Sequence, residues 1–229
     1  MHENVVIDRF VNTSSGNLFW QNQKTIELEP GALIMNSSIR IGLHMERYSA
    51  INRCKIEGPC GVGAFGYWGD VDIARYVNVG ARSVIGGFEH PTERLSMSGL
   101  FWGQNAHLLG VEPLSDFDCP NNKPDAPRTT LESDVWVSAN SIVLSGRHLA
   151  VGTVIGAGSV VTRDTEPYGI YIGNPARLIR FRFSESLIGE LLDSKWWELP
   201  PSVLMTLDME DVESSLDILR TYRLSSSRD

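Results

Sequence analysis

Aliphatic residues recur at every sixth position in the second half of the chain. Six consecutive members of this series are aliphatic: Leu131, Val137, Val143, Leu149, Ile155 and Val161. A second series, two residues earlier, is mostly small or β-branched: Val135, Ser141, Arg147, Thr153, Ser159 and Thr165. An α-helix turns by about 600° over six residues, so a stripe with this period would drift around it. The pattern therefore predicts a β-solenoid, in which each hexapeptide forms one side of a triangular coil.

The same period appears earlier in the chain, in runs that do not share one frame. The runs are Leu33, Ile39, Met45 and Ile51, then Ile56 and Val62, then Ile73, Val79 and Ile85. Between runs the spacing changes to five residues and to eleven, which we interpret as bulged or bent corners of the coil. Cys54 and Cys60 lie on the track of small residues, and we interpret them as small core residues rather than as a redox or metal site.

The period stops between Ile85 and Leu131, and residues 87–130 form an inserted segment rich in aromatic residues and ending in prolines. A loop of this length in a compact domain is usually functional or disordered, and its aromatic content favours an ordered functional loop. We expect a mainly β fold, a β-solenoid with this inserted loop. The predicted organisation is a lead-in over residues 1–32, a β-helix over 33–182 and a helical cap over 183–229.

Two short amphipathic helices are expected in the cap. Ser184 can N-cap the first, whose apolar residues are Leu187, Ile188, Leu191 and Leu192. Asp208 can cap the second, whose apolar residues are Val212, Leu216 and Leu219. We expect these helices to close the open end of the solenoid, because an uncovered end exposes core residues and strand edges.

Composition narrows the classes of function. The net charge of −8 over 229 residues argues against a nucleic-acid partner, which normally requires a basic face. Three cysteines are too few for a disulfide framework. The start of the chain lacks the pattern of a signal peptide, and no stretch approaches the roughly 18 apolar residues of a membrane span. We therefore expect a cytoplasmic protein without a membrane span.

Several motifs resemble those of the hexapeptide-repeat acyltransferases with a left-handed β-helix, in the branch of xenobiotic and polysaccharide acetyltransferases. They are Ile73–Gly80 (IARYVNVG), His90-Pro91 with Leu95-Ser96, Asp134–Val137, Val154–Asp164, Gly173–Arg177, Arg180–Phe183 and Trp196-Trp197. The resemblance covers roughly residues 33–200. The chain departs from the family pattern where a glycine is expected after the inward aliphatic, at Glu132, Ser138, Leu144 and Ala150.

The resemblance implies acetyl transfer from acetyl-CoA, with His90 as the general base and no resident metal. It implies that the pantetheine arm of CoA lies between coils of adjacent subunits of a homotrimer. The residues implied for CoA are Ser138, Ala139, Gly156, Ala157, Arg163, Arg177 and Arg180. The inserted loop would bind a small-molecule or saccharide acceptor through Phe101, Trp102, Asn105 and Asp116.

Several functions remain open on the sequence. The favoured one is O-acetylation of a sugar or polysaccharide precursor. The alternatives are O-acetylation of an antibiotic of the chloramphenicol or streptogramin type and N-acetylation of a nucleotide-linked amino sugar. A zinc hydratase on the same fold would need converging histidines, and no two histidines of this chain lie within a few residues of each other. A scaffold without catalytic activity is the last option.

Overall fold

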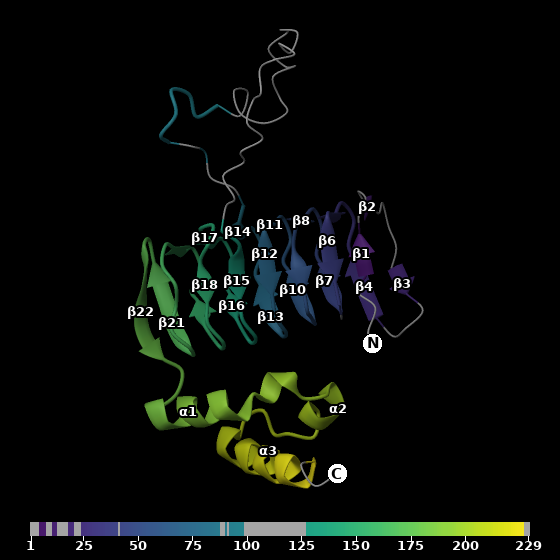
Figure 1. Ribbon diagram of the computed structural model, residues 1–229, viewed down its shortest axis with the longest axis vertical. Coiled ribbons are helices and arrows are strands. Elements are labelled where there is room, and N and C mark those ends of the chain that lie inside the picture. The colour runs from purple at the N-terminus through teal and green to yellow at the C-terminus, as the bar shows by residue number, and fades with distance from the viewer. Residues whose placement is uncertain are drawn as a thin grey trace.

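The computed structural model describes residues 5–7, 11–12, 18–20, 24–40, 42–87, 90, 92–98 and 127–226. Their strands form three sheets that make the three sides of a left-handed parallel β-helix (Figure 1). Successive coils pair in parallel, so each inward residue stacks on the one a coil earlier. Antiparallel pairs are found at the two ends, where β1, β2 and β3 join the first coil and β22 joins the last.

The sheets are named A, C and B in the order in which the chain visits them. Sheet A contains β1 (Val5–Ile7), β6 (Ser37–Ile39), β9 (Lys55–Ile56), β12 (Val71–Ile73), β15 (Thr129–Leu131) and β18 (His148–Leu149). Sheet C contains β3 (Leu18–Trp20), β4 (Lys24–Leu28), β7 (Leu43–Met45), β10 (Cys60–Val62), β13 (Val77–Val79), β16 (Trp136–Val137), β19 (Val154–Ile155), β21 (Gly169–Gly173) and β22 (Ala176–Phe181). Sheet B contains β2 (Val11–Asn12), β5 (Leu33–Met35), β8 (Ala50–Asn52), β11 (Tyr67–Gly69), β14 (Val84–Gly86), β17 (Ile142–Val143) and β20 (Val160–Val161).

The spacing of the inward residues is irregular in the first coils because these coils are shorter than the later ones. Along sheet A the stacked residues Ile39, Ile56 and Ile73 are 17 residues apart, whereas Leu131 and Leu149 are 18 apart. The early coils are one residue shorter at the corner between sheets B and A. Residues in the left-handed conformation turn the chain there, at Asn36, Arg53 and Asp70. The predicted bent corners are therefore confirmed.

Two details of the predicted core are corrected by this frame. Ile34 is fully buried and Leu33 is not, so the prediction of Leu33 as the inward residue is wrong. The eleven-residue gap after Val62 contains one further inward residue, Trp68, which stacks between Ile51 and Ile85 in sheet B. The other aliphatic residues of the predicted series are buried.

The two cysteines of the small-residue track are core residues, as expected. Cys54 and Cys60 are buried free thiols. Burial raises the pKa of each thiol to about 12. Because the thiolate is the reactive form, we predict that iodoacetamide at neutral pH leaves both cysteines unmodified in the folded protein and alkylates them after unfolding. Peptide mass spectrometry measures this, and rapid alkylation of either cysteine in the folded chain would contradict the assignment.

The C-terminal helices follow the last strand. They are α1 (Glu185–Ser194), the short 3-10 helix η2 (Trp196–Glu198), α2 (Pro201–Leu204) and α3 (Val212–Ser226). Ser184 caps α1 as predicted, by accepting a hydrogen bond from Leu187 N. The predicted cap of the last helix is wrong. Asp211 rather than Asp208 caps α3, accepting from Ser214 N, because Asp208 lies four residues before the helix and instead accepts from Glu210 N.

The helices lie along one corner of the solenoid and do not close its end (Figure 1). The ring of Trp196 stacks on Tyr76, with 5.8 Å between ring centroids. The guanidinium of Arg75 donates to the carbonyls of Trp197 and Glu198 at 3.3 and 3.1 Å. Both solenoid residues belong to the corner between sheets A and C, several coils from the end, so the expectation of an end cap is wrong in position.

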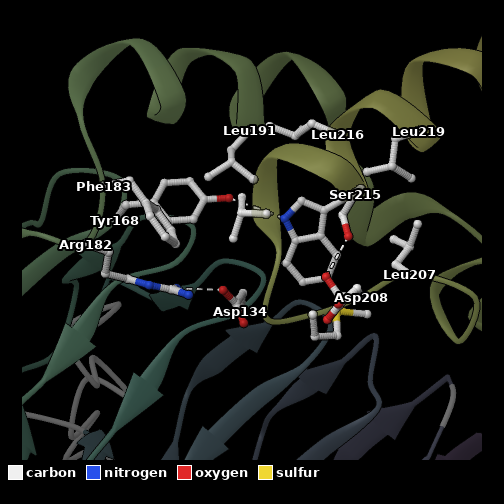
Figure 2. Close-up of a pocket in the computed structure, with 13 residues that line it drawn as sticks. Asp134, Tyr168, Arg182, Phe183, Leu191, Leu207, Asp208, Ser215, Leu216 and Leu219 are labelled. Carbon is white, nitrogen blue, oxygen red and sulfur yellow. Dashed lines mark hydrogen bonds and ion pairs between the residues drawn. The ribbon is translucent and has the colours of Figure 1, made fainter.

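Arg182 joins the solenoid to the helical segment (Figure 2). Its Nη1 donates to Asp134 Oδ2 at 2.7 Å and to the Gly152 carbonyl at 3.0 Å. Its guanidinium also lies 5.3 Å from the ring centroid of Tyr168 and 5.2 Å from that of Phe183. A cavity of about 260 Å³ separates this cluster from α3. The helices are thus attached to the corner by polar and aromatic contacts and by an apolar cluster that joins Val151 of the corner to the helices.

We predict that Arg182→Ala loosens the helical segment. The change leaves the half-buried Asp134 without its cation, which costs about 1–3 kcal/mol. Chymotrypsin should then cleave within residues 183–226 about tenfold faster, since each 1.4 kcal/mol changes an opening equilibrium about tenfold. Arg220→Ala is the matched control, because Arg220 pairs with Glu190 and Asp217 at the exposed surface. Equal cleavage rates for the two variants would contradict the role of Arg182.

Candidate active site

The inserted segment leaves the solenoid at a corner that requires glycine. Gly86 ends β14 with φ +65°, and a Cβ there would lie 2.4 Å from the Gly69 carbonyl oxygen. Gly87, with φ +97°, continues the turn between sheets B and A. His90 follows three residues later and is exposed. The corner therefore fixes the point at which the inserted segment, which carries His90, leaves the solenoid.

The returning end of the segment is anchored to the same corner. Arg128 donates from Nε and Nη2 to the two carboxylate oxygens of Asp72, at 2.8 and 2.6 Å. Its Nη2 also donates to the carbonyls of Arg53 and Val71, each at 3.0 Å. The hydrogen bond to Asp72 raises the pKa of the Arg128 guanidinium. Both ends of the inserted segment are thus attached to adjacent coils of the solenoid.

The imidazole of His90 is held by a backbone carbonyl. Its Nδ1 lies 2.6 Å from the Met97 oxygen. A carbonyl oxygen can only accept, so Nδ1 carries the hydrogen and the neutral ring has its lone pair on Nε2. This tautomer is the one a general base needs, with Nδ1–H as the orienting donor and Nε2 as the proton acceptor.

The residues expected to hold pantetheine meet at a different corner, between sheets C and B. Ser138 and Ala139 follow β16, and Gly156 and Ala157 follow β19 one coil later. The coils are in register, because Val137 pairs with Ile155. The four predicted residues therefore lie on two stacked turns of one corner.

Backbone N–H groups line this corner. In the first coils a glutamate accepts from the N–H of the next coil: Glu29 from Arg47 and Glu46 from Ala64, each at 2.9 Å. The equivalent N–H groups of later coils have no hydrogen-bond partner within the described residues: those of Ala81, Ala139 and Ala157. Gly80 lies beneath one of them, and its Cβ would come within 2.6 Å of Ala139 N. Sequence reasoning missed Gly80 and Ala81, although small residues at this position recur from coil to coil.

The three arginines expected near the nucleotide end of CoA are exposed and separate into two places. Arg177 and Arg180 lie on β22 at the edge of sheet C, and each donates to a nearby carbonyl, of Ala176 and Phe181 respectively. Arg163 follows β20 of sheet B and lies toward the opposite corner. The structure thus places Arg177 and Arg180, but not Arg163, on the sheet that leads into the N–H corner.

Other candidates can be placed or set aside. Phe101, Trp102, Asn105 and Asp116 lie outside the described residues. His148 points outward from sheet A and pairs with Glu132 at 3.1 Å. Among the residues that the structure describes, no three His, Cys, Asp or Glu side chains gather as metal ligands. Within the same residues, no helix is long and apolar enough to cross a membrane.

Known proteins with similar sequences are acetyltransferases, although no family model matches the chain. A probable macrolide acetyltransferase of Lysinibacillus sphaericus is 33% identical over 132 residues, which cover 53% of this chain and 72% of that protein. The chloramphenicol acetyltransferase of Escherichia coli is 46% identical over 72 residues, 31% of this chain. That match spans about a third of the chloramphenicol acetyltransferase, 34% of its length.

A solved structure supports the fold. AntD, an N-acyltransferase from Bacillus cereus in complex with dTDP-4-amino-4,6-dideoxyglucose and coenzyme A, superposes with a TM-score of 0.54. The superposition covers 76% of this chain and 89% of that one at 19% sequence identity, so it speaks for the fold alone. Together with the extensive match to the macrolide acetyltransferase, it agrees with the family motifs of the coils. The chain belongs to the hexapeptide-repeat acyltransferases with a left-handed β-helix.

Proposed function

We propose that the protein transfers an acetyl group from acetyl-CoA to a hydroxyl group, with His90 as the general base. The observation that carries this proposal is the hydrogen bond between His90 Nδ1 and the Met97 carbonyl, which leaves Nε2 as the basic nitrogen. A histidine oriented in this way is suited to removing a proton near neutral pH.

The reaction proceeds in two proton transfers. His90 Nε2 takes the proton of the acceptor hydroxyl while its oxygen attacks the thioester carbonyl of acetyl-CoA. The tetrahedral intermediate then collapses, the carbon–sulfur bond breaks, and the imidazolium returns the proton to the leaving thiolate. Products are the acetyl ester and CoA, and no acyl-enzyme is needed because the thioester is already activated. A backbone N–H or loop hydroxyl would hold the oxyanion.

The corner between sheets C and B is the proposed binding site for the pantetheine arm. The arm contains two amide groups, whose carbonyls can accept from the unpaired N–H groups of Ala139 and Ala157. Ser138 has a small side chain, whereas the space beside Gly156 holds the side chain of Ile172 from the next coil. We propose Arg177 and Arg180 as partners of the CoA phosphates, and we leave Arg163 out because it lies toward another corner. Because CoA is an intracellular donor, the proposal also places the protein in the cytoplasm.

A homotrimer is part of the proposal, because within one chain His90 and the proposed pantetheine site lie at different corners of the solenoid. His90 leaves from the corner between sheets B and A, whereas the N–H groups line the corner between C and B. A neighbouring copy can bring its own loop to this second corner. Sheet B also exposes an apolar strip to a partner, at Val84, Ile142 and Leu144. Light scattering tests this, with about three times 25.4 kDa expected and an active monomer as the contrary result.

The acceptor is proposed to be a sugar or polysaccharide precursor, bound by Phe101, Trp102, Asn105 and Asp116. A hydroxylated antibiotic is the second candidate, because the matching relatives are named chloramphenicol and macrolide acetyltransferases. A nucleotide-linked amino sugar is the third.

Release of free CoA thiol tests these alternatives. Acetyl-CoA is mixed with the protein and, in separate reactions, with simple sugars, chloramphenicol, a macrolide, a streptogramin and a nucleotide-linked amino sugar. We expect acceptor-dependent thiol release with a hydroxylated compound. Thiol release with antibiotics alone would show that the acceptor is an antibiotic and not a sugar. Absence of acceptor-dependent release with every compound of the panel would count against acetyl transfer.

A further inference from the structure

Three consecutive coils place large side chains at one point of the corner between sheets C and B. Tyr48, Phe65 and Arg82 occupy equivalent positions, each 17 residues after the last, and all have left-handed backbone conformations with φ of 55°, 57° and 58°. This conformation is unfavourable for bulky side chains. Glycine occupies the same position at Gly31 and Gly158, so the fold does not require large residues there.

The two rings form an exposed stack. Tyr48 is 60% exposed and Phe65 55%, and their ring centroids lie 5.4 Å apart at an interplanar angle of 22°. Gly31 accommodates the ring of Tyr48, because a Cβ on Gly31 would come within 2.4 Å of Tyr48 Cδ1. Aromatic side chains held in this way on a surface are typical of platforms on which flat rings stack.

Cations lie beside the rings. Arg82 is one coil beyond Phe65, and Arg47 precedes Tyr48. Within the part of the chain that the structure describes, neither guanidinium has an ion pair or hydrogen bond, and both residues are exposed. The nearby carboxylates of Glu29 and Glu46 each accept a backbone N–H through one oxygen. An anion at Arg82 would also meet the unpaired N–H of Ala81.

We propose that Tyr48, Phe65 and Arg82 bind a nucleoside phosphate, with the base on the rings and a phosphate at Arg82. Two coil spacings, about 10 Å, separate Tyr48 from Arg82, which matches the reach of a nucleoside diphosphate from base to phosphate. A neutral aromatic compound would use the rings and leave Arg82 without a role. The two sources of this chemistry are the adenosine bisphosphate end of CoA, which would then lie at Arg82 in place of Arg177 and Arg180, and a nucleotide-linked acceptor. The choice between these two ligands rests on the proposed function, whereas binding of a nucleoside phosphate does not.

Calorimetric titration with dTDP and with adenosine 3′,5′-bisphosphate tests the proposal. We expect the wild-type protein to bind at least one of them. Phe65→Ala and Arg82→Ala should each weaken that binding about tenfold, as loss of one stacked ring or one phosphate contact does. Phe65→Tyr keeps a ring and should bind as the wild type does, whereas Phe65→Leu should not. Lys55→Ala, which removes an exposed cation from sheet A, is the control and should leave binding unchanged.

The two sources give different patterns. If the bisphosphate is the ligand, Phe65→Ala also raises the KM for acetyl-CoA. If dTDP is the ligand, the KM for acetyl-CoA stays unchanged. Failure of the wild type to bind either nucleotide would overturn the proposal, as would binding that Phe65→Ala and Arg82→Ala leave intact. Chloramphenicol binding that depends on Phe65, without nucleotide binding, would also overturn it. Nucleotide binding without acetyl transfer would remove the proposed function and leave this inference standing.

Discussion

Replacing His90 by alanine should lower kcat for acetyl transfer by about 10²- to 10⁴-fold, the usual contribution of a general base. Thiol release under saturating acetyl-CoA and acceptor measures the effect. CoA binding should change by no more than about twofold, because the N–H groups proposed to hold pantetheine belong to another corner. The loss therefore falls on the chemical step and not on binding of the donor.

His44→Ala is the matched control for this experiment. His44 is also exposed, lies on β7 and pairs with Glu27 at 3.2 Å, away from the loop exit. Its replacement should leave kcat unchanged. Full activity of the His90→Ala variant, or an equal loss in both variants, would show that His90 is not the base.

Trp68→Ala should be the most damaging substitution in the solenoid core. The indole is fully buried and is stacked between Ile51 and Ile85. Truncating a buried Trp costs about 3–5 kcal/mol, because neighbouring coils close the resulting space only in part. For a chain of this size the thermal midpoint should fall by about 10 °C, as measured by circular dichroism.

Trp68→Phe separates the loss of volume from the loss of polar contacts. The buried Nε1 of Trp68 has no hydrogen-bond partner among the described residues. Phenylalanine therefore loses no hydrogen bond and keeps a ring in the core, so its midpoint should fall by less than half as much as that of the alanine variant. A midpoint for Trp68→Ala within about 2 °C of the wild type would contradict the inward position of Trp68.

The later coils were predictable because their period is unbroken. From Leu131 to Val161 each inward residue is aliphatic and six residues from the next. In the earlier coils one side is a residue shorter, so a six-residue count selected Leu33 where Ile34 is inward. It also passed over Trp68, because an aromatic residue interrupts an otherwise aliphatic series. The division into lead-in, solenoid and cap at residues 33 and 183 stays a prediction.

The candidate site was predictable in parts. The resemblance to the family implies His90 and the corner residues, but the tautomer of His90 depends on Met97 seven residues away. The unpaired N–H groups depend on how successive coils stack, and they become recognisable only when the lengths of the coils are known.

For the helices, the apolar spacing predicts where they lie in the sequence. Their place along a corner depends on contacts of Trp196 and Arg182 with distant coils.

A crystal structure of the protein with CoA tests the central claim most directly. We predict the pantetheine arm along the corner between sheets C and B, with its amide carbonyls accepting from Ala139 N and Ala157 N. We also predict the CoA sulfur beside the Nε2 of a His90, supplied by a neighbouring copy. CoA bound in the cavity between the solenoid and the helices, or at any other place away from the corner between sheets C and B, would contradict the account.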